Sequence, residues 1–169
     1  GTNARIEGGA LIIEARREGP KITSARLQSV AKWQYGYFEA VAKVPTGKGT
    51  WPAIWMLNDC LRHPNEPGSV GWPDAGEIDI MEHVGYDPTR FHFSLHSGKY
   101  NHTIGTQRTH VEPCADAVDR FHTFGLDWRP TSIAFYLDGR EVYRVVDWRA
   151  HDLPPSFPLL PFHFQFFII

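Results

Sequence analysis

The sequence has few cysteines, almost no net charge and no long apolar run, and each shortage excludes a class of protein. Two isolated cysteines, Cys60 and Cys114, make neither a disulfide framework nor a metal-binding pattern. A net charge of −2 gives no basic face for nucleic acid. No segment approaches the roughly 18–20 apolar residues of a membrane span. We therefore expect no metal site, no nucleic-acid partner and no membrane span.

The sequence leaves the state of the two cysteines open and shows no signal peptide in its first residues. Cys60 and Cys114 could form one disulfide, or both could be buried free thiols, which the lack of a cysteine pattern favours. The first residues, 1–5, lack the apolar stretch of a secretory signal peptide.

What the chain does have is a core and many rings. With 169 residues, of which 42% are hydrophobic, it is long and apolar enough for one globular domain. Aromatic residues reach 14%, which is high. A surplus of aromatics over the needs of a core is typical of a binding cleft.

The hydrophobic pattern is that of β-strands. Residues 35–44 and 90–97 alternate apolar and polar side chains, and no stretch holds a 3.6-residue period. Asp138-Gly139 predicts a hairpin turn. The expected strands are 10–16, 21–29, 35–44, 51–57 (a buried strand or a strand-like loop), 76–84, 90–97, 121–128, 132–137 and 140–146, with a loop over 60–75. Short strands at this spacing predict an antiparallel sandwich.

Residues 77–82, Glu-Ile-Asp-Ile-Met-Glu, are the most informative segment. On a regular strand Glu77, Asp79 and Met81 share one face and Glu82 points to the other. One extra residue, accommodated as a β-bulge, returns Glu82 to the face of the other two acids. Like charges placed together do not stabilise a fold, because each raises the pKa of the other.

Hydrolysis of a glycosidic bond does need such a group. A retaining glycosidase uses an ionised carboxylate as nucleophile and a protonated carboxyl as acid, roughly 5–5.5 Å apart. The alternative is an acidic strand that faces solvent. Two features favour the hydrolytic interpretation. The residues between the acids, Ile78, Ile80 and Met81, are apolar, and the segments on both sides are rich in aromatic rings.

The chain resembles glycoside hydrolase family 16, in its laminarinase-like branch, over residues 3–148. The segments that carry the resemblance are 77–82 (EIDIME), 3–11 (NARIEGGAL), 23–27 (TSARL), 35–40 (YGYFEA), 49–57 (GTWPAIWML), 121–128 (FHTFGLDW) and 136–139 (YLDG).

The resemblance implies an all-β fold, a concanavalin A-like jelly-roll sandwich of two curved antiparallel sheets with an open cleft on the concave face. Residues 1–169 would be a single catalytic domain, incomplete at both ends, with 157–169 as a tail foreign to it. It also implies secretion, a monomer, no required cofactor, and a structural calcium site whose segments are missing here.

The resemblance assigns three catalytic roles. Glu77 would be the nucleophile, with a low pKa, and Glu82 the general acid and then the base, with a high pKa. Asp79 would share a proton with one of the glutamates and keep the two roles apart.

Five residues are candidates for substrate binding, each with a structural alternative. His96 matches a cleft histidine, or bonds within the core, and Trp72 is a platform for a sugar ring. Arg26 would reach the hydroxyl groups of the substrate, or form a surface ion pair. Trp51 and Trp55 lie in an apolar run where core packing is an equal rival.

The resemblance thus favours a retaining endo-β-glucanase that cuts β-1,3 bonds in laminarin-like glucans, with β-1,3/1,4 bonds also possible. Met81, as the bulge residue, disfavours enzymes specific for mixed-linkage glucan. The alternatives are a galactan hydrolase of the carrageenan or agar type, a glucan-binding module and an inactive fragment. Retention of all three acids disfavours a module that only binds.

Overall fold

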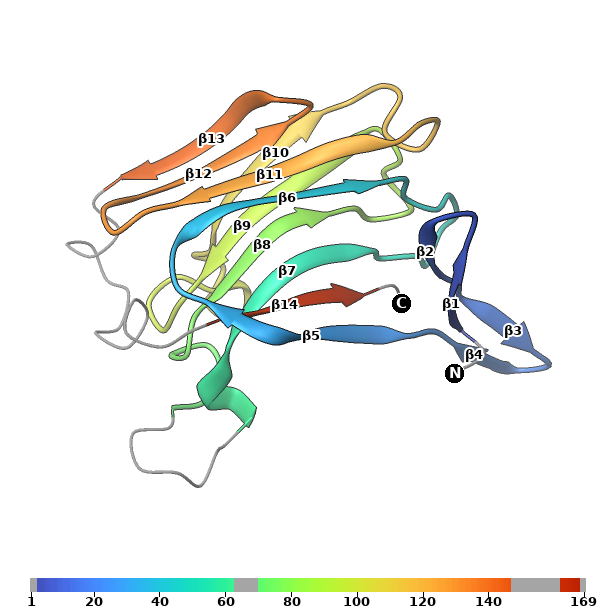
Figure 1. The fold of residues 1–169 in the computed structure, drawn as a ribbon, viewed down its shortest axis with the longest axis horizontal. Helices are drawn as coiled ribbons and strands as arrows, with labels where there is room; N and C mark the ends of the chain where they lie inside the picture. The colour runs from blue at the N-terminus through green and yellow to red at the C-terminus, as the bar shows by residue number, and fades with distance from the viewer. Residues whose placement is uncertain (1–2, 63–69, 147–161, 168–169) are drawn as a thin grey trace.

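Two antiparallel sheets packed face to face form the body of the molecule (Figure 1). The computed structural model describes residues 3–62, 70–146 and 162–167. From edge to edge, the larger sheet contains β10 (Arg108–Pro113), β9 (Arg90–His96), β8 (Glu77–Glu82), β7 (Ala53–Asn58), β14 (Phe162–Phe167) and β5 (Arg26–Trp33). The smaller sheet contains β13 (Arg140–Val146), β12 (Ser132–Leu137), β11 (His122–Trp128) and β6 (Gly36–Ala42). The predicted all-β sandwich is confirmed.

Two short hairpins precede the sandwich. They are β1 (Ala4–Glu7) with β2 (Ala10–Ile13), and β3 (Arg16–Glu18) with β4 (Lys21–Thr23). The two helical turns are η1 (Asp59–Arg62) and η2 (His102–Ile104). In the described part of the chain, no helix has the length and apolar character to cross a membrane.

The N-terminal strand predictions need correction. The strand expected over 10–16 ends at Ile13 as β2, and β3 begins only at Arg16 and runs beyond the expected range. The strand expected over 21–29 is divided into β4 and β5. Between β2 and β3 the chain is diverted at Glu14, whose backbone N–H donates to the carbonyl of Asn3 and whose carboxylate binds Arg5 and Arg16. The hydrogen bond to Asn3 extends the β1–β2 pairing by one residue, and the second hairpin begins after it.

Three strands, β1, β10 and β14, lie outside the expected strand ranges. β10 is an edge strand with one aliphatic residue, Val111, so its sequence carries no two-residue apolar period. β14 lies within the segment that was expected to be a foreign tail, yet it pairs with both β7 and β5. Residues 157–161, 168 and 169 lie outside the described residues, and the expectation about this tail stays a prediction.

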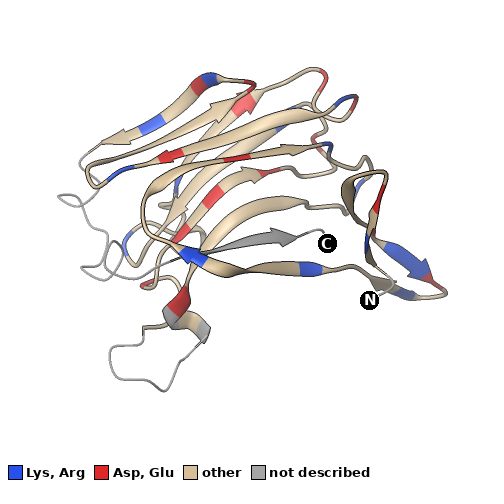
Figure 2. Ribbon diagram, in the orientation of Figure 1, with Lys and Arg blue, Asp and Glu red and all other residues tan. Residues whose placement is uncertain are grey.

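The core lies between the two sheets and fixes the orientation of β8. Ile78 and Ile80 are fully buried among large side chains from both sheets. These include Phe91, Phe93, Phe124, Trp128 and Phe135. Because side chains alternate along a strand, Glu77 and Asp79 point to the opposite face, away from the smaller sheet. Figure 2 shows acidic positions along β8 and basic positions on β5 of the same sheet.

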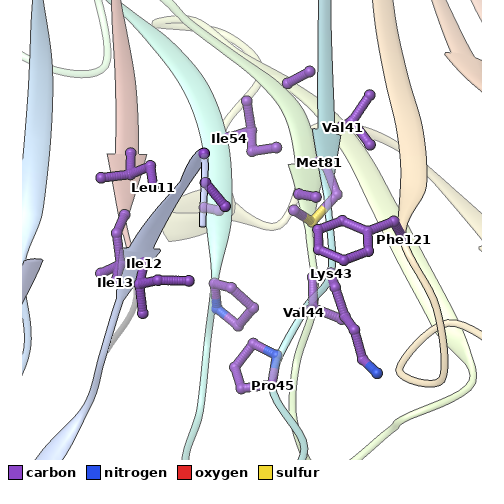
Figure 3. A pocket seen from close by; sticks show the side chains of 16 residues that line it. Leu11, Ile12, Ile13, Val41, Lys43, Val44, Pro45, Ile54, Met81 and Phe121 are labelled. Atoms are coloured by element: carbon purple, nitrogen blue, oxygen red, sulfur yellow. The ribbon is translucent and has the colours of Figure 1, made fainter. Parts of the chain in front are cut away.

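A pocket of about 690 Å³ opens between the sheets beside the first hairpin (Figure 3). Its walls are apolar and come from β2, from β6 and the residues after it, and from the start of β7. Met81 lies in this pocket, on the core side of β8. The residue that the sequence identifies with the bulge is therefore anchored by apolar contacts.

The segment after β8 is fixed by a close backbone approach. His83 donates its N–H to the carbonyl of Pro52 at 3.0 Å, and Gly85 donates to that of Thr50 at 2.9 Å. A Cβ at Gly85 would lie 1.9 Å from the carbonyl oxygen of Gly47. Only glycine fits there, so this contact sets the position of the loop that precedes β7.

We predict that Gly85→Ala lowers the free energy of unfolding by about 1–3 kcal/mol, because the new methyl group forces backbone atoms apart. Urea unfolding of both proteins would measure the difference. Gly71→Ala is the matched control, since nothing lies within 4 Å of a Cβ at that glycine. Equal losses in the two variants would contradict the close-approach argument.

Candidate active site

A β-bulge in β8 places three carboxylates on one face. Asp79 is opposite Ser94 and Glu82 is opposite His92, so β8 has one more residue than β9 between these pairs. The partner on the other side shows the same shift, with Trp55 opposite Asp79 and Ile54 opposite Met81. Both residues of the bulge, Ile80 and Met81, are buried in the core. The predicted bulge is thus confirmed.

The three acids are close enough to interact and are all withdrawn from water. Asp79 is 2% exposed, and Glu77 and Glu82 are partly buried. Burial, followed by the charge of Asp79 and a hydrogen bond to it, raises the pKa of Glu77 to about 8. Burial and the charge of Glu82 raise the pKa of Asp79 well above its usual range. Burial also raises the pKa of Glu82.

The raised pKa of Glu77 differs from the low value that the sequence interpretation expected. The main reason is that Glu77 is buried, and the charge of Asp79 and the hydrogen bond to it raise the pKa further. Two carboxyl groups in such contact hold a proton between them and titrate as a pair. At neutral pH the acids therefore retain at least one shared proton.

Two indole N–H groups balance this group of acids. Trp72 donates to Oε2 of Glu77 at 2.6 Å, and Trp51 donates to Oε1 of Glu82 at 3.0 Å. Each bond favours the ionised carboxylate and opposes the effect of burial on its pKa. Trp51 is 47% exposed, so it belongs to the surface of the site and not to the core.

His96 lies directly beside the acids. Its register partner is Glu77, and its Nε2 is 3.1 Å from Oδ2 of Asp79. Burial lowers the pKa of His96, and the charges of Glu77 and Glu82 oppose this change. A neutral imidazole in contact with the central acid is the result.

Arg26 and Trp55 extend the same face toward β5. The guanidinium carbon of Arg26 is 4.6 Å from the centre of the Trp55 ring, a cation–π contact. The charge of Glu77 acts on Arg26 as well, although burial is the larger influence and lowers the pKa of this arginine. Trp55 is opposite Asp79 and is only partly buried. All five predicted binding residues therefore surround the three acids.

Two residues of the site were missed by sequence reasoning. His102, in η2, lies 4.9 Å from the Trp72 ring and 5.4 Å from the His96 ring, between ring centres. Ser94 forms a hydrogen bond that lowers the pKa of Glu82. The alternation of β9 places Ser94 on the face of His96 and gives a signal for it, whereas a loop histidine such as His102 carries no such signal.

A sandwich with adjacent carboxylates and indole rings on one open face is the arrangement typical of glycoside hydrolases. The comparison with protein families agrees with this class. The chain belongs to the glycosyl hydrolases family 16, whose model matches residues 2–168.

Individual relatives come from several organisms. A beta-glucanase of Rhodothermus marinus is 45% identical over 172 residues, which cover 99% of this chain and 59% of the relative. A glucan endo-1,3-beta-glucosidase of Cryptopygus antarcticus is 40% identical over 148 residues, 82% of this chain and 52% of the relative. The crystal structure of the laminarinase from Rhodothermus marinus has a TM-score of 0.87 and 42% identity, and the match covers 99% of this chain and 68% of that one. The chain thus spans little more than half the length of these two curated relatives.

The raised pKa of Glu77 predicts a pH-dependent stability. A carboxyl whose pKa is higher in the folded state stabilises the fold fully below its unfolded value of 4.5. That stabilisation is lost as the pH rises through about 8. We expect Glu77→Gln to reduce this dependence, to which Asp79 and Glu82 also contribute, and to be more stable than the wild type at pH 8 by about 1–3 kcal/mol, since a pKa unit corresponds to roughly 1.4 kcal/mol.

Urea unfolding at pH 5 and pH 8 would measure the effect. Glu18→Gln, at an exposed glutamate of β3, is the control and should leave the pH dependence unchanged. A wild-type stability that is equal at both pH values, or a Glu77→Gln variant with the same slope, would contradict the assignment.

Proposed function

We propose that the protein is a retaining endo-β-glucanase whose preferred bond is the β-1,3 linkage of laminarin-like glucans. The observation that supports it most strongly is the arrangement of Glu77, Asp79 and Glu82 on one face, with indole donors on both glutamates. The names of the relatives, which include a beta-glucanase and an endo-1,3-beta-glucosidase, agree with this substrate class.

In the proposed first step Glu77 attacks the anomeric carbon while Glu82 protonates the oxygen of the leaving sugar. A new bond joins the sugar to a Glu77 oxygen as the glycosidic bond breaks. In the second step Glu82, now ionised, takes a proton from water. The water oxygen displaces Glu77, so the product keeps the original configuration and both carboxyl groups return to their starting forms.

Asp79 is proposed to hold the shared proton. It is the most deeply buried of the three acids, so the ionised form is least favourable there. The N–H of Trp72 stabilises the ionised form of Glu77 at the same time. The nucleophile is then an anion that accepts hydrogen bonds from Asp79 and from Trp72, in spite of the raised pKa that the pair shows together.

The substrate is proposed to lie across the face that carries the acids. Indole rings at Trp51, Trp55 and Trp72 offer flat apolar surfaces for the C–H faces of sugar rings. Arg26 and His96 supply charge and hydrogen bonds beside these rings.

The remaining expectations belong to this proposal. Two carboxyl groups perform both chemical steps, so the reaction itself requires no cofactor. An extracellular location, which we expect for an enzyme with a polymeric substrate, is part of the proposal. A monomeric state is a separate part of it. Two alternatives remain, a galactan hydrolase and a glucan-binding module. The experiments below distinguish each of them from an active glucanase.

The first prediction concerns substrate and acids together. The protein should release reducing sugars from laminarin, and Glu77→Gln and Glu82→Gln should each lower kcat by about 10³-fold or more, because each removes an obligatory group. Circular dichroism checks that both variants fold. Activity on agar or carrageenan in place of laminarin would contradict the glucan assignment, and glucan binding by a folded protein without hydrolysis would support the module.

A second prediction separates the roles of the two glutamates. The substrate is an aryl β-laminaribioside, and azide should restore activity on it to both Glu77→Ala and Glu82→Ala. Glu82→Ala should give the β-glycosyl azide, because the covalent intermediate still forms and azide replaces water. Glu77→Ala should give the α-glycosyl azide by direct displacement. Product configurations read by NMR in the reverse order would exchange the two roles.

A third prediction concerns Trp51. Trp51→Phe keeps an aromatic surface but loses the N–H that favours ionised Glu82, so the pKa of Glu82 should rise. The basic limb of the kcat/KM profile should therefore move to higher pH. Trp55→Phe is the control and should leave this limb in place, since the N–H of Trp55 donates to no carboxylate of the described residues. Equal profiles for all three proteins would rule out the proposed contribution of Trp51.

A further inference from the structure

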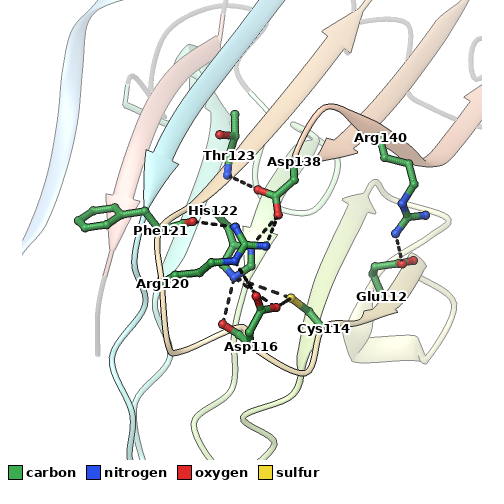
Figure 4. A network of polar contacts seen from close by, with 9 residues as sticks. All are labelled: Glu112, Cys114, Asp116, Arg120, Phe121, His122, Thr123, Asp138 and Arg140. Carbon is green, nitrogen blue, oxygen red and sulfur yellow. Dashed lines mark hydrogen bonds and ion pairs between the residues drawn. The ribbon is translucent and has the colours of Figure 1, made fainter.

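A cluster of three different metal-binding side chains lies outside the face that carries the acids (Figure 4). It consists of Cys114, which directly follows β10, Asp116 in the next turn and His122 at the start of β11. We call these three residues the β10–β11 cluster. One potential ligand atom from each residue lies within 4.8 Å of the others. Sequence reasoning assigned no metal site, because the three residues match no common ligand spacing.

The distances within the β10–β11 cluster are close to those of a tetrahedral zinc site. Sγ of Cys114 is 3.3 Å from Oδ1 of Asp116 and 3.8 Å from Nε2 of His122. Oδ1 of Asp116 is 3.9 Å from the same Nε2. With zinc bonds of about 2.0–2.3 Å and tetrahedral angles, ligand atoms lie roughly 3.3–3.6 Å apart. Movements of a few tenths of an ångström would complete three corners of the tetrahedron.

The histidine ring is held in place by a carboxylate on its other nitrogen. The side chain of His122 is fully buried, and its Nδ1 lies 2.9 Å from Oδ2 of Asp138. Nε2 lies 3.1 Å from the backbone carbonyl oxygen of Asp116, which can only accept, so zinc binding requires Nε2 to give up a proton and this hydrogen bond. An N–H at Nδ1 that donates to Asp138 then leaves the lone pair of Nε2 for the metal. A carboxylate that orients a metal-binding histidine through its other nitrogen is a common feature of zinc sites. Oδ1 of Asp138 accepts from the backbone N–H of Thr123, so the orienting group is itself fixed.

The surrounding charges also suit a divalent cation. Arg120 binds Oδ2 of Asp116 at 2.6 Å and Oδ2 of Asp138 at 2.8 Å, and it leaves Oδ1 of Asp116 available. Burial and the hydrogen bond to Asp116 raise the pKa of the Cys114 thiol to about 11, so the metal must displace this proton. Once it does, one thiolate, two carboxylates and one guanidinium give a local charge of −2, which a divalent ion neutralises. Cys114 is a free thiol and is only partly buried, and the Asp116 side chain is 47% exposed, so an ion has a path from solvent.

We propose that Cys114, Asp116 and His122 form a zinc-binding site in which Asp138 orients the histidine and a water molecule takes the fourth position. The combination of thiolate, imidazole and carboxylate favours zinc over the hard cations calcium and magnesium, which prefer oxygen ligands alone. The site joins the end of β10 in the larger sheet to the start of β11 in the smaller one. Zinc there would link the two sheets.

Cobalt(II) is the probe, because it occupies zinc sites and reports its ligands by absorption. We expect the purified protein to bind one Co²⁺ per chain, with a thiolate-to-cobalt charge-transfer band in the near ultraviolet and the intense visible bands of tetrahedral cobalt. Zn²⁺ added afterwards should remove both signals. In Cys114→Ser the charge-transfer band should disappear. In Asp116→Asn, which alters a ligand, the affinity should fall by more than the roughly 10–100-fold that follows loss of a residue that only supports a ligand.

Matched controls distinguish this site from adventitious binding. Cys60→Ser removes the other cysteine of the chain and should keep the band, and Asp119→Asn removes an exposed carboxylate of the same turn and should keep the affinity. In the Cys60→Ser protein, Zn²⁺ should also protect Cys114 from alkylation by iodoacetamide. Cobalt bound equally well by Cys114→Ser, or alkylation that Zn²⁺ does not slow, would overturn the proposal.

Discussion

The burial of one extra residue in β8 is the constraint on which the site depends. Ile80 and Met81 are consecutive, yet both side chains lie on the core side of the sheet. A regular strand would send one of them to solvent and Glu82 with the core residues. Because the two apolar side chains pack between the sheets and beside the first hairpin, the strand resumes its alternation one position later. Glu82 then lies on the face of Glu77 and Asp79.

The cost of that arrangement is electrostatic. Burial disfavours ionisation of all three acids, and each adds to the cost for its neighbours. The sheet offsets part of this cost with hydrogen-bond donors, the indoles of Trp51 and Trp72, and with His96 at the central acid. The same features that would destabilise the fold leave protons held within the group at neutral pH, which is what a pair of acid and nucleophile requires.

Sequence reasoning reached the parts of the fold in which local pattern and tertiary role coincide. β8, its bulge and the strands around it have clear alternation, and the carboxylates are unusual enough within an apolar strand to be noticed. β10 was missed because its own residues show no apolar alternation, and it is a strand because it pairs with β9. His102 and the β10–β11 cluster were missed for a related reason. His102 lies in a turn without strand alternation, and the residues of the β10–β11 cluster match no ligand spacing and meet only because the connection after β10 folds back on the start of β11.

The central claim is that the face organised by the bulge performs double displacement with Glu77 as the nucleophile. The most direct test is to trap the covalent intermediate with a 2-deoxy-2-fluoro-β-laminaribiosyl fluoride, followed by peptide fragmentation and mass spectrometry. The account predicts one fluorinated disaccharide per chain, attached to the side chain of Glu77. An adduct on Glu82 or Asp79, or hydrolysis of laminarin with inverted configuration and no adduct, would contradict it.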